Sequence, residues 1–399
     1  MHDDLLSVAA ARAIVERSVV PLGSEEIGIE HALGRILAED VVAPHPVPPF
    51  ASSAMDGFAV TAGPAGRTLR IAGEARAGHP SRKSVRRGTA IAISTGAAMP
   101  DGADAVLQVE LTSRPDPDHV TLSDDVAPGR NVRPAGDDMA AGAVVLRAGT
   151  RLGPAELGVA VSAGRATVRA GEQPSVAVVA TGDELADPGE PLGPGQIHNS
   201  NAITLAGLAM HAGARVFTVT GAADTLADTE EALAVALEEA DVVVISGGVS
   251  VGPHDHVKPA LERLAVEQAF WRVALRPGKP TWFGHRDGTL VFGLPGNPVS
   301  AMVTFLLFAR PALHALQGAP FAQPTRTARI ATPVARNPHR DEAIRVSLRT
   351  DDQGTIVATP TGPQGSHILS SMVAADGLAL VERGAEPLPA GAPVSVEPI

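Results

Sequence analysis

The sequence predicts a multidomain protein built around a doubly wound α/β domain with β-rich regions on either side. Three observations lead to this prediction. The chain has 399 residues, which is more than one hydrophobic core usually organises. Residues 174–320 alternate apolar strands with amphipathic helices, the pattern of a parallel sheet covered on both faces. The flanking segments consist of short strands between Gly and Pro turns.

Within the α/β segment, each expected element has its own signal. Asn199 or Ser200 can cap a helix that ends near Gly213. The remaining helices are expected in DTLADTEEALAVALEEA, HVKPALERLA and PGNPVSAMVTFLLFARPALHAL, and the strands in SVAVVAT, RVFTVTG, DVVVISGG and TLVFGL.

The flanking regions divide by composition. The predicted units are a connecting domain of residues 1–43 and 141–173, a β-rich domain of residues 44–140, and a small C-terminal β-barrel of residues 321–399. The first of these begins with an expected amphipathic helix that places Leu6, Ala9, Ala13 and Ile14 on one face.

Composition excludes several classes of function. The net charge of −12 argues against a nucleic-acid or acidic-membrane surface, so an anionic ligand needs a local basic cluster. The chain has no cysteine, which leaves oxygen and nitrogen groups to carry the chemistry. Asp3 and Asp4 stand where a signal peptide would be basic, and the apolar runs considered are far below the ~20 residues of a membrane span. We therefore expect a soluble, cytoplasmic protein.

Polar or glycine-rich loops follow four predicted strands. In open parallel sheets, ligands bind beyond the carboxyl ends of the strands, so one crevice should collect these loops. The four loops are 181–184, 221–224, 246–252 and 295–300.

Two of these loops are suited to anions. In SGGVSVG, Gly247, Gly248 and Ser250 can bring backbone N–H groups close to a phosphate, although an ordinary tight turn is the alternative. In PGNPVS, Asn297 can cap a helix whose first turn and Ser300 hydroxyl face an anion, although a purely structural cap is the alternative.

A basic turn, LRPGKP, lies between two predicted strands. Arg276 and Lys279 flank its Pro and Gly, with Arg272 four residues earlier, and together they can hold an oxyanion. A solvated basic turn is the alternative, but a basic cluster beside glycine loops in an acidic chain favours anion binding.

Carboxylates at the same rim are suited to Mg²⁺, which takes one or two carboxylates together with phosphate oxygens and water. They are Asp183, Glu184, Asp224 and Asp255. Ribose binding and helix capping are the alternatives, and capping is at least as well supported for Asp224. A zinc site at His254 and His256 is rejected, because two histidines without further spaced ligands are a weak signal.

Further candidates lie outside the α/β segment. Asp56 follows two prolines in PPFASSAMDGFAV, where a structural Asx-turn is the alternative to a functional role. Thr95 and Gly96 follow a strand in ISTGAAMPDGADAV. In the C-terminal region, Arg345 lies on a predicted strand, and GPQGSHILSS contains Ser366, His367, Ser370 and Ser371.

Eight segments occur in the order found in one known family and span nearly the whole chain. They are PPFASSAMDGFAV, ISTGAAMPDGADAV, ATGDEL, GQIHNSN, ISGGVSVGPHD, LRPGKP, GLPGNPVS and GPQGSHILSS. With them the sequence resembles the MoeA family, the molybdopterin molybdotransferases, whose animal relative is the gephyrin E domain. The sequence departs from the family at Arg272 and Arg276, where bacterial relatives often carry Lys; the charge is kept but the geometry is not.

The resemblance implies four structural domains, one of them MogA-like, in an elongated homodimer. The implied enzyme inserts molybdate into adenylylated molybdopterin with Mg²⁺, giving molybdenum cofactor and AMP, and contacts a MogA-like adenylyltransferase and molybdoenzyme apoproteins. The implied catalytic residues are Asp56, Thr95, Glu184, Asp224 and Asp255, the last two also as Mg²⁺ ligands. Those for the pterin and AMP phosphates are Gly182, Gly247, Gly248, Ser250, Gly296 and Asn297, and those for molybdate are Arg276, Lys279, Ser300, Arg345 and Ser371.

Three questions stay open at the level of sequence. The chain could instead be a MogA-like adenylyltransferase, which uses ATP and releases pyrophosphate, or a non-catalytic pterin-binding scaffold. Molybdate and tungstate have nearly equal size and the same charge, so they are not distinguished. Because Asp56 and Thr95 lie in a different domain from Glu184, the cleft should form between domains and could be shared by two subunits.

Overall fold

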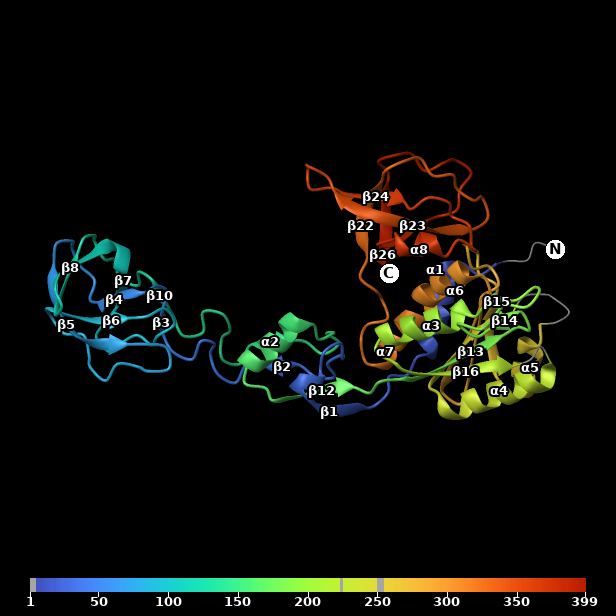
Figure 1. Ribbon diagram of the computed structural model, residues 1–399, viewed down its shortest axis with the longest axis horizontal. Helices are drawn as coiled ribbons and strands as arrows, with labels where there is room; N and C mark the ends of the chain where they lie inside the picture. Colours follow the sequence, from blue (N-terminus) through green and yellow to red (C-terminus); the bar gives the residue numbers. More distant parts are fainter. Residues whose placement is uncertain (1–4, 223–224, 250–254) are drawn as a thin grey trace.

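The computed structural model describes residues 5–222, 225–249 and 255–399, which form an elongated, bent molecule (Figure 1). A β-domain lies at one end, a small connecting domain occupies the middle, and the α/β domain and C-terminal β-domain lie together at the other end. The predicted multidomain α/β plus β architecture is confirmed.

The distant β-domain is organised by a six-stranded sheet with the order β7-β4-β6-β5-β9-β8. Phe58, Leu107 and Val120 belong to the core on one face of this sheet. Its elements are β3 (Ser52–Ser53), β4 (Gly57–Val60), β5 (Thr68–Ala75), β6 (Thr89–Ile93), β7 (Ala105–Gln108), η2 (Val109–Leu111), β8 (Thr112–Asp116), β9 (His119–Leu122) and β10 (Val132–Arg133).

The connecting domain joins two segments that are far apart in the sequence. Strand β1 pairs with β12, and β2 pairs with β11, both antiparallel. Its elements are β1 (Ser24–Gly28), η1 (Ile29–His31), β2 (Val41–Val42), β11 (Val144–Leu146), α2 (Pro154–Ser162) and β12 (Thr167–Gly171). The chain therefore leaves this domain after β2 to form the distant β-domain and returns to it at β11.

The central sheet of the α/β domain has the order β16-β13-β17-β21-β20-β18. The first four strands are parallel, as predicted, and β20 and β18 add an antiparallel edge that the sequence analysis did not foresee. The strands are β13 (Ser175–Thr181), β16 (Arg215–Ala222), β17 (Val242–Ser246), β18 (Glu267–Trp271), β20 (Trp282–Arg286) and β21 (Thr289–Leu294), with a short pair β14 (Leu185–Ala186) and β15 (Ile197–His198) beside them.

Helices cover both faces of this sheet. Alternate residues of β13 point to opposite faces, so Val176 and Val178 enter one core while Ala177 and Val179 enter the other. The first core includes α3 (Ser200–His211) and the helix that follows β21, and the second includes α4 (Leu226–Glu239) and α5 (Val257–Arg263). As predicted, Asn199 caps α3 by accepting from the Ala202 N–H at 3.1 Å.

The helix that follows β21 is continuous but irregular. It consists of α6 (Pro298–Thr304), one π-helical turn η3 (Phe305–Ala309) and α7 (Arg310–Leu316). Pro311 has no N–H to donate to the Leu307 carbonyl, which instead accepts from Arg12 Nε at 3.1 Å. This 19-residue helix is apolar and long enough to cross a membrane, but 83% of its most apolar window is buried, as expected for a core helix.

The expected face of the first helix is partly wrong: Leu6 and Ile14 pack against the α/β core, but Ala9 is exposed. Helix α1 (Val8–Ser18) begins after Leu6 and buries Val8, Ala11 and Val15. A start at Val8, with Ser7 as the N-cap, places the buried stripe at i, i+3 and i+7. This stripe packs in the α/β core against η3 and α7. The domain boundaries themselves stay a prediction.

The C-terminal domain is a closed five-stranded barrel, as predicted. The strand order is β23-β24-β22-β26-β25, and β25 pairs with β23 to close the sheet. Strand β19 (Leu275–Arg276) of the α/β domain pairs in parallel with the first two residues of β23, Asp341 and Glu342. The barrel elements are β22 (Arg326–Ile330), β23 (Asp341–Thr350), β24 (Ile356–Pro360), α8 (Ser370–Val373), β25 (Gly377–Val381) and β26 (Pro393–Pro398).

Candidate functional site

A cavity of about 100 Å³ lies at the carboxyl ends of β13, β17 and β21. Glu184, Gly247 and Gly296, three of the residues singled out in the sequence, line it together. The cavity is completed by Thr181, Leu185, Ile197, His198, Asn199, Ser200, Asn201, Ser246 and Pro298. Three of the four predicted loops therefore meet in one crevice. The last two residues of the fourth, which include Asp224, lie outside the described residues.

Two glycines set the path of the loop after β17. Gly247 and Gly248 have φ angles of 94° and 65°, which favour glycine. A Cβ at Gly248 would lie 2.4 Å from Val257 Cγ2. The loop therefore packs against α5 more tightly than a side chain would allow. Ser250 and His254, which continue this loop, lie outside the described residues.

Asn201 holds two of the crevice loops together, and the sequence analysis missed it. Its Nδ2 donates to Ser246 Oγ at 2.8 Å and to the Gly296 carbonyl at 2.7 Å. Its Oδ1 is buried without a hydrogen-bond partner. The available signal was the polar run GQIHNSN, in which two asparagines start one helix although capping needs only one.

The acidic rim is described only in part. Glu184 is exposed and lines the crevice. The Glu184 carboxylate folds back over the backbone at Gly182, where a Cβ atom would lie 2.4 Å from Glu184 Oε2. Asp255 is half-buried. Burial lowers the pKa of Lys258, and the nearby Asp255 carboxylate opposes this shift. Over the described ranges, no group of three or more His, Asp or Glu side chains could hold a metal ion.

The start of α6 contacts the C-terminal barrel. Asn297 occupies the N-cap position, but its side chain makes no capping hydrogen bond, contrary to expectation. The Val299 N–H donates to the Ser366 carbonyl at 3.2 Å, so one first-turn N–H expected to face an anion is already bonded. Ser300 is buried, and its carbonyl accepts from the Thr304 hydroxyl at 2.8 Å.

Arg345 is a fully buried cation close to this contact. Its Nη2 donates to the carbonyls of Pro363 and Gly365 at 3.1 and 3.3 Å, but Nε and Nη1 are buried without partners. Burial lowers the pKa of Arg345. Buried polar groups are normally hydrogen-bonded, so two unpaired guanidinium nitrogens indicate a place for an acceptor.

The segment that follows β24 leads to Ser371 in α8. The Ser371 hydroxyl donates to the Ile368 carbonyl at 2.6 Å, and the Thr361 hydroxyl donates to the Ser371 carbonyl at 3.1 Å. The Arg345 N–H donates to Gln364 Oε1 at 2.9 Å. The loop of residues 361–369 therefore contacts Arg345, Ser371 and the start of α6.

The basic turn reaches the same junction but is partly neutralised. Arg276 is exposed and pairs with Glu342 of β23, with Nη1 and Oε1 at 3.2 Å. Gly278 lies against the helix one turn beyond Ser300, since a Cβ there would lie 2.5 Å from Thr304 Cγ2. Lys279 is exposed.

The Arg272 guanidinium group stacks on the ring of Trp271. Its guanidinium carbon lies 4.0 Å from the centre of the Trp271 ring, and Lys258 Nζ lies 3.8 Å from the same centre. Trp271 therefore holds two cations beside the loop that follows β17. The sequence analysis missed Trp271 and Lys258, because aromatic–cation contacts between separate elements leave no local pattern.

Asp56 and Thr95 meet in the distant β-domain. The Thr95 N–H donates to Asp56 Oδ1 at 2.8 Å, and both residues are exposed. The carboxylate thus bonds to a loop 39 residues away and not within a local Asx-turn. Figure 1 places this domain at the opposite end of the molecule from the crevice. A single chain does not bring these two residues to Glu184.

The mixed sheet with its polar crevice, joined to a barrel and a separate β-domain, defines a class of multidomain α/β proteins with a binding crevice at the strand ends. The chain matches three family models: the MoeA N-terminal region (domain I and II) over residues 6–164, a probable molybdopterin binding domain over residues 177–315, and the MoeA C-terminal region (domain IV) over residues 327–399. The chain belongs to the MoeA family.

Full-length relatives agree with this assignment. The chain is 36% identical over 399 residues to the molybdopterin molybdenumtransferase of Haemophilus influenzae, covering 99% of this chain and 98% of that protein. It is 37% identical over 364 residues to molybdopterin molybdenumtransferase 2 of Mycobacterium tuberculosis, covering 88% and 89%. A crystal structure of the molybdopterin biosynthesis MoeA protein from Pyrococcus horikoshii aligns with a TM-score of 0.82 and 29% identity over 99% of this chain and 100% of that one.

Proposed function

We propose that this chain is a molybdopterin molybdotransferase that inserts molybdate into adenylylated molybdopterin and releases AMP. It acts in molybdenum cofactor biosynthesis, as its relatives named molybdopterin molybdenumtransferase do. The observation that carries the proposal is buried Arg345, with two unpaired guanidinium nitrogens beside the loop that contacts the start of α6. A tetrahedral dianion satisfies such a group, because its oxygens accept several charge-assisted hydrogen bonds.

The crevice residues would bind and orient the adenylylated pterin. Backbone groups around Gly247 and Gly296 approach the ligand closely because neither residue has a side chain. Asn201 fixes the two loops relative to each other, and its unpaired Oδ1 is available to a donor on the ligand. Molybdate would be held beside them by Arg345, Ser371 and the basic turn. Catalysis then consists mainly of positioning and charge stabilisation.

A single Mg²⁺ would be held at the acidic rim by carboxylates and substrate phosphates, without a cage of protein ligands. Mg²⁺ commonly takes one or two carboxylates and completes its shell with phosphate oxygens and water. Glu184 and Asp255 are the described candidates, and Asp224 remains a proposed ligand from outside the described residues. When bound, the ion would offset the negative charge of the substrate phosphates.

The proposed active site is shared between two subunits. Support comes from the separation of the Asp56–Thr95 pair from the crevice within one chain. It also comes from large apolar side chains exposed on the connecting domain and on α3, which a partner subunit would cover. These are Leu33, Val161, Ile203 and Met210, with exposed fractions of 61%, 54%, 63% and 59%.

Subunit mixing tests the shared site. Inactive Asp56→Ala and Glu184→Gln proteins, mixed after reversible dissociation, should regain part of the wild-type AMP release. Each mixed dimer would carry one site with both wild-type residues. Mixing Asp56→Ala with Thr95→Ala is the matched control and should regain nothing, because both changes affect the same half of every site. Equal failure of both mixtures would show that Asp56 of one subunit and Glu184 of the other do not form a common site.

Product analysis tests the reaction itself. Purified protein with adenylylated molybdopterin should release AMP only when molybdate is added. The second candidate, a MogA-like adenylyltransferase, remains because the crevice belongs to a domain type described as molybdopterin-binding. That activity would instead consume ATP and molybdopterin and release pyrophosphate. A scaffold without catalysis would do neither.

We also propose a cytoplasmic location and two protein contacts. A MogA-like adenylyltransferase would supply the adenylylated substrate, and molybdoenzyme apoproteins would receive the product. Pull-down experiments with and without the trapped substrate test both contacts. If neither protein is recovered under either condition, direct transfer is contradicted.

A further inference from the structure

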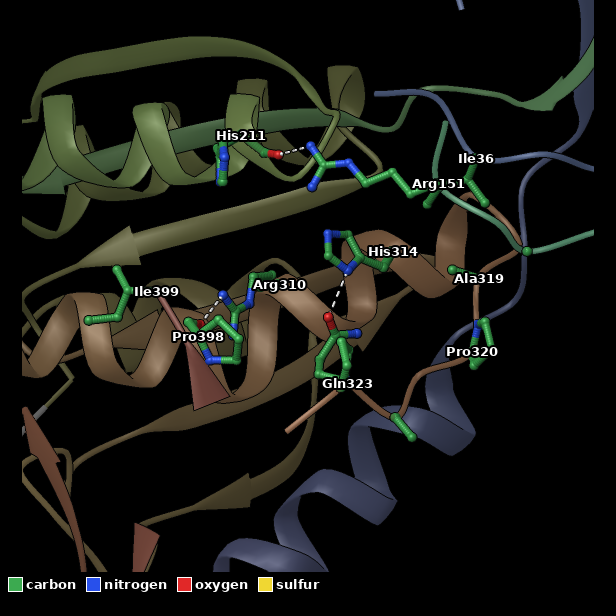
Figure 2. Close-up of a pocket in the computed structure, with 13 residues that line it drawn as sticks. Ile36, Arg151, His211, Arg310, His314, Ala319, Pro320, Gln323, Pro398 and Ile399 are labelled. Atoms are coloured by element: carbon green, nitrogen blue, oxygen red, sulfur yellow. Dashed lines mark hydrogen bonds between the residues drawn. The ribbon is translucent and has the colours of Figure 1, made fainter. Parts of the chain in front are cut away.

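A second, larger cavity lies where three parts of the molecule meet (Figure 2). It has a volume of about 450 Å³ and is bounded by the connecting domain, α7 and the end of β26. The catalytic crevice involves the start of the helix Pro298–Leu316, whereas this cavity lies beside its end. Pro298 of the crevice and Arg310 of this cavity are about 18 Å apart along the helix at the usual helical rise, so the cavities are distinct.

His314 presents an acceptor to this cavity. Its Nδ1 lies 2.9 Å from Gln323 Oε1 (Figure 2), and the Gln323 amide is oriented by its Nε2 donating to the Phe321 carbonyl at 3.2 Å. Gln323 Oε1 can only accept, so the proton of a neutral His314 resides on Nδ1. The unprotonated Nε2 is buried and has no hydrogen-bond partner.

Two arginines bring positive charge to the same cavity. Arg310 is nearly buried; its Nη1 donates to the Pro398 carbonyl at 2.7 Å, its Nη2 lies 3.9 Å from Glu397 Oε2, and its Nε is buried without a partner. Arg151 reaches in from the connecting domain and donates to the His211 carbonyl at 2.8 Å. Arg151, Arg310 and His314 therefore line one cavity.

The remaining wall is apolar and stiff. It is formed by Ile36, Ile399 and three prolines, Pro320, Pro324 and Pro398, together with Gly149, Ala319 and Ala322. Cavities of roughly 300–1,000 Å³ with apolar walls and a few convergent polar groups are typical of small-molecule sites. His314 Nε2 and Arg310 Nε are buried without hydrogen-bond partners. Because buried polar atoms are normally hydrogen-bonded, these two nitrogens favour a ligand site over a gap between domains that needs no ligand.

We propose that this cavity binds a small organic carboxylate with an apolar, ring-containing body and an N–H or O–H donor. The donor bonds to His314 Nε2, the carboxylate lies between Arg151 and Arg310, and the ring packs on Ile36 and the prolines. Such a ligand bridges the connecting domain, α7 and the C-terminal barrel. A bound ligand therefore restricts the movement of the connecting domain relative to the α/β and C-terminal domains, without contacting the crevice.

Ligand-observed NMR with indole-3-acetate and indole-3-carboxylate tests the proposal on the full-length protein. Both probes carry a ring N–H, an apolar ring and a carboxylate. We expect binding to wild type, at least tenfold weaker binding to His314→Phe and to Arg151→Met, and no change for His339→Phe, an exposed histidine outside the cavity. Indole, which lacks the carboxylate, should bind at least tenfold more weakly than either acid.

Folding of each variant is checked independently by its thermal midpoint and its molybdate-dependent AMP release. If His314→Phe fails that check, His314→Asn replaces it, because Asn retains a donor for Gln323 but lacks the Nε2 acceptor. Absence of binding to wild type, equal binding to all variants, or a crystal structure with ordered water alone in the cavity would each overturn the proposal.

Discussion

Arg12 and Glu397 form a two-point ion pair between the first helix and the last strand. Nη1 lies 2.6 Å from Oε1 and Nη2 lies 3.0 Å from Oε2, while only 1% of the Glu397 side chain is exposed. Arg12 also satisfies the helix carbonyl that Pro311 leaves without a donor. One side chain thus connects α1, the π-helical turn and the barrel.

Replacement of Arg12 by Met should destabilise the protein strongly. The change leaves the buried Glu397 carboxylate with only Arg310, whose Nη2 is 3.9 Å away, and breaking a buried pair typically costs about 3–5 kcal/mol. Urea unfolding measures the loss. Arg17→Met, on the exposed side of the same helix, is the control and should change stability by less than about 0.5 kcal/mol. A similarly small effect at Arg12 would show that the pair is not a structural joint.

Gly248→Ala should reduce both stability and pterin binding. A methyl group there meets Val257 Cγ2 at 2.4 Å, and the φ of 65° is strained for alanine, so a loss of about 1–3 kcal/mol is expected. Gly88→Ala is a matched control with a φ of 78° and nothing near its Cβ. The Michaelis constant for the adenylylated substrate and the unfolding midpoint are the measurements. Equal behaviour of the two variants would argue that the crevice loop has room to spare.

His314 should make the protein less stable below about pH 6.5. The pKa of His314 is lowered from 6.5 to about 4; burial is the main cause, the bond to Gln323 opposes the shift, and the charges of Arg151, Arg310 and His211 add to it. Between those values the unfolded chain binds the proton and the folded chain does not, so stability falls as pH falls from about 6.5 to about 4. The loss at pH 5 should reach about 2 kcal/mol.

The matching experiment compares urea unfolding of wild type and His314→Asn at pH 7 and pH 5. Asn cannot take up a proton, so the variant should lose about 2 kcal/mol less than wild type between the two pH values. Parallel losses in the two proteins would assign the acid sensitivity to other groups.

The sequence could predict the α/β domain and the crevice because both follow from local patterns. The apolar runs of β13 and β17 and the caps of α3 are short stretches of consecutive residues that can be recognised in the sequence. Parallel strands then bring the loops at their carboxyl ends together. The sequence alone therefore places Glu184, Gly247 and Gly296 at one edge of the sheet, where they line one cavity.

What the sequence could not predict depends on pairs of distant residues. Arg276 pairs with Glu342, 66 residues away, so a turn that is basic in sequence is partly neutral in space. Helix α1 packs against α7, which lies about 300 residues later in the chain, and the composition of α1 does not specify that neighbour. The burial of Arg345 is likewise a property of barrel closure, since a strand residue can face either side.

Arg345 gives the sharpest separation between a structural and a functional role. Its Nε and Nη1 contribute no hydrogen bonds to the fold, so replacing it with Met should leave the unfolding free energy within about 1 kcal/mol of wild type or raise it. Urea unfolding of the Arg345→Met protein checks this. A loss of about 3 kcal/mol or more would identify the guanidinium as a structural anchor.

The dependence of AMP release on molybdate concentration in Arg345→Met, compared with wild type, tests the central claim most directly. Loss of a charge-assisted oxyanion contact should raise the half-saturating molybdate concentration by at least about tenfold, while the half-saturating concentration of adenylylated molybdopterin stays unchanged. An unchanged molybdate dependence in the folded variant would contradict the assignment of this buried arginine, and of the junction around it, to oxyanion binding.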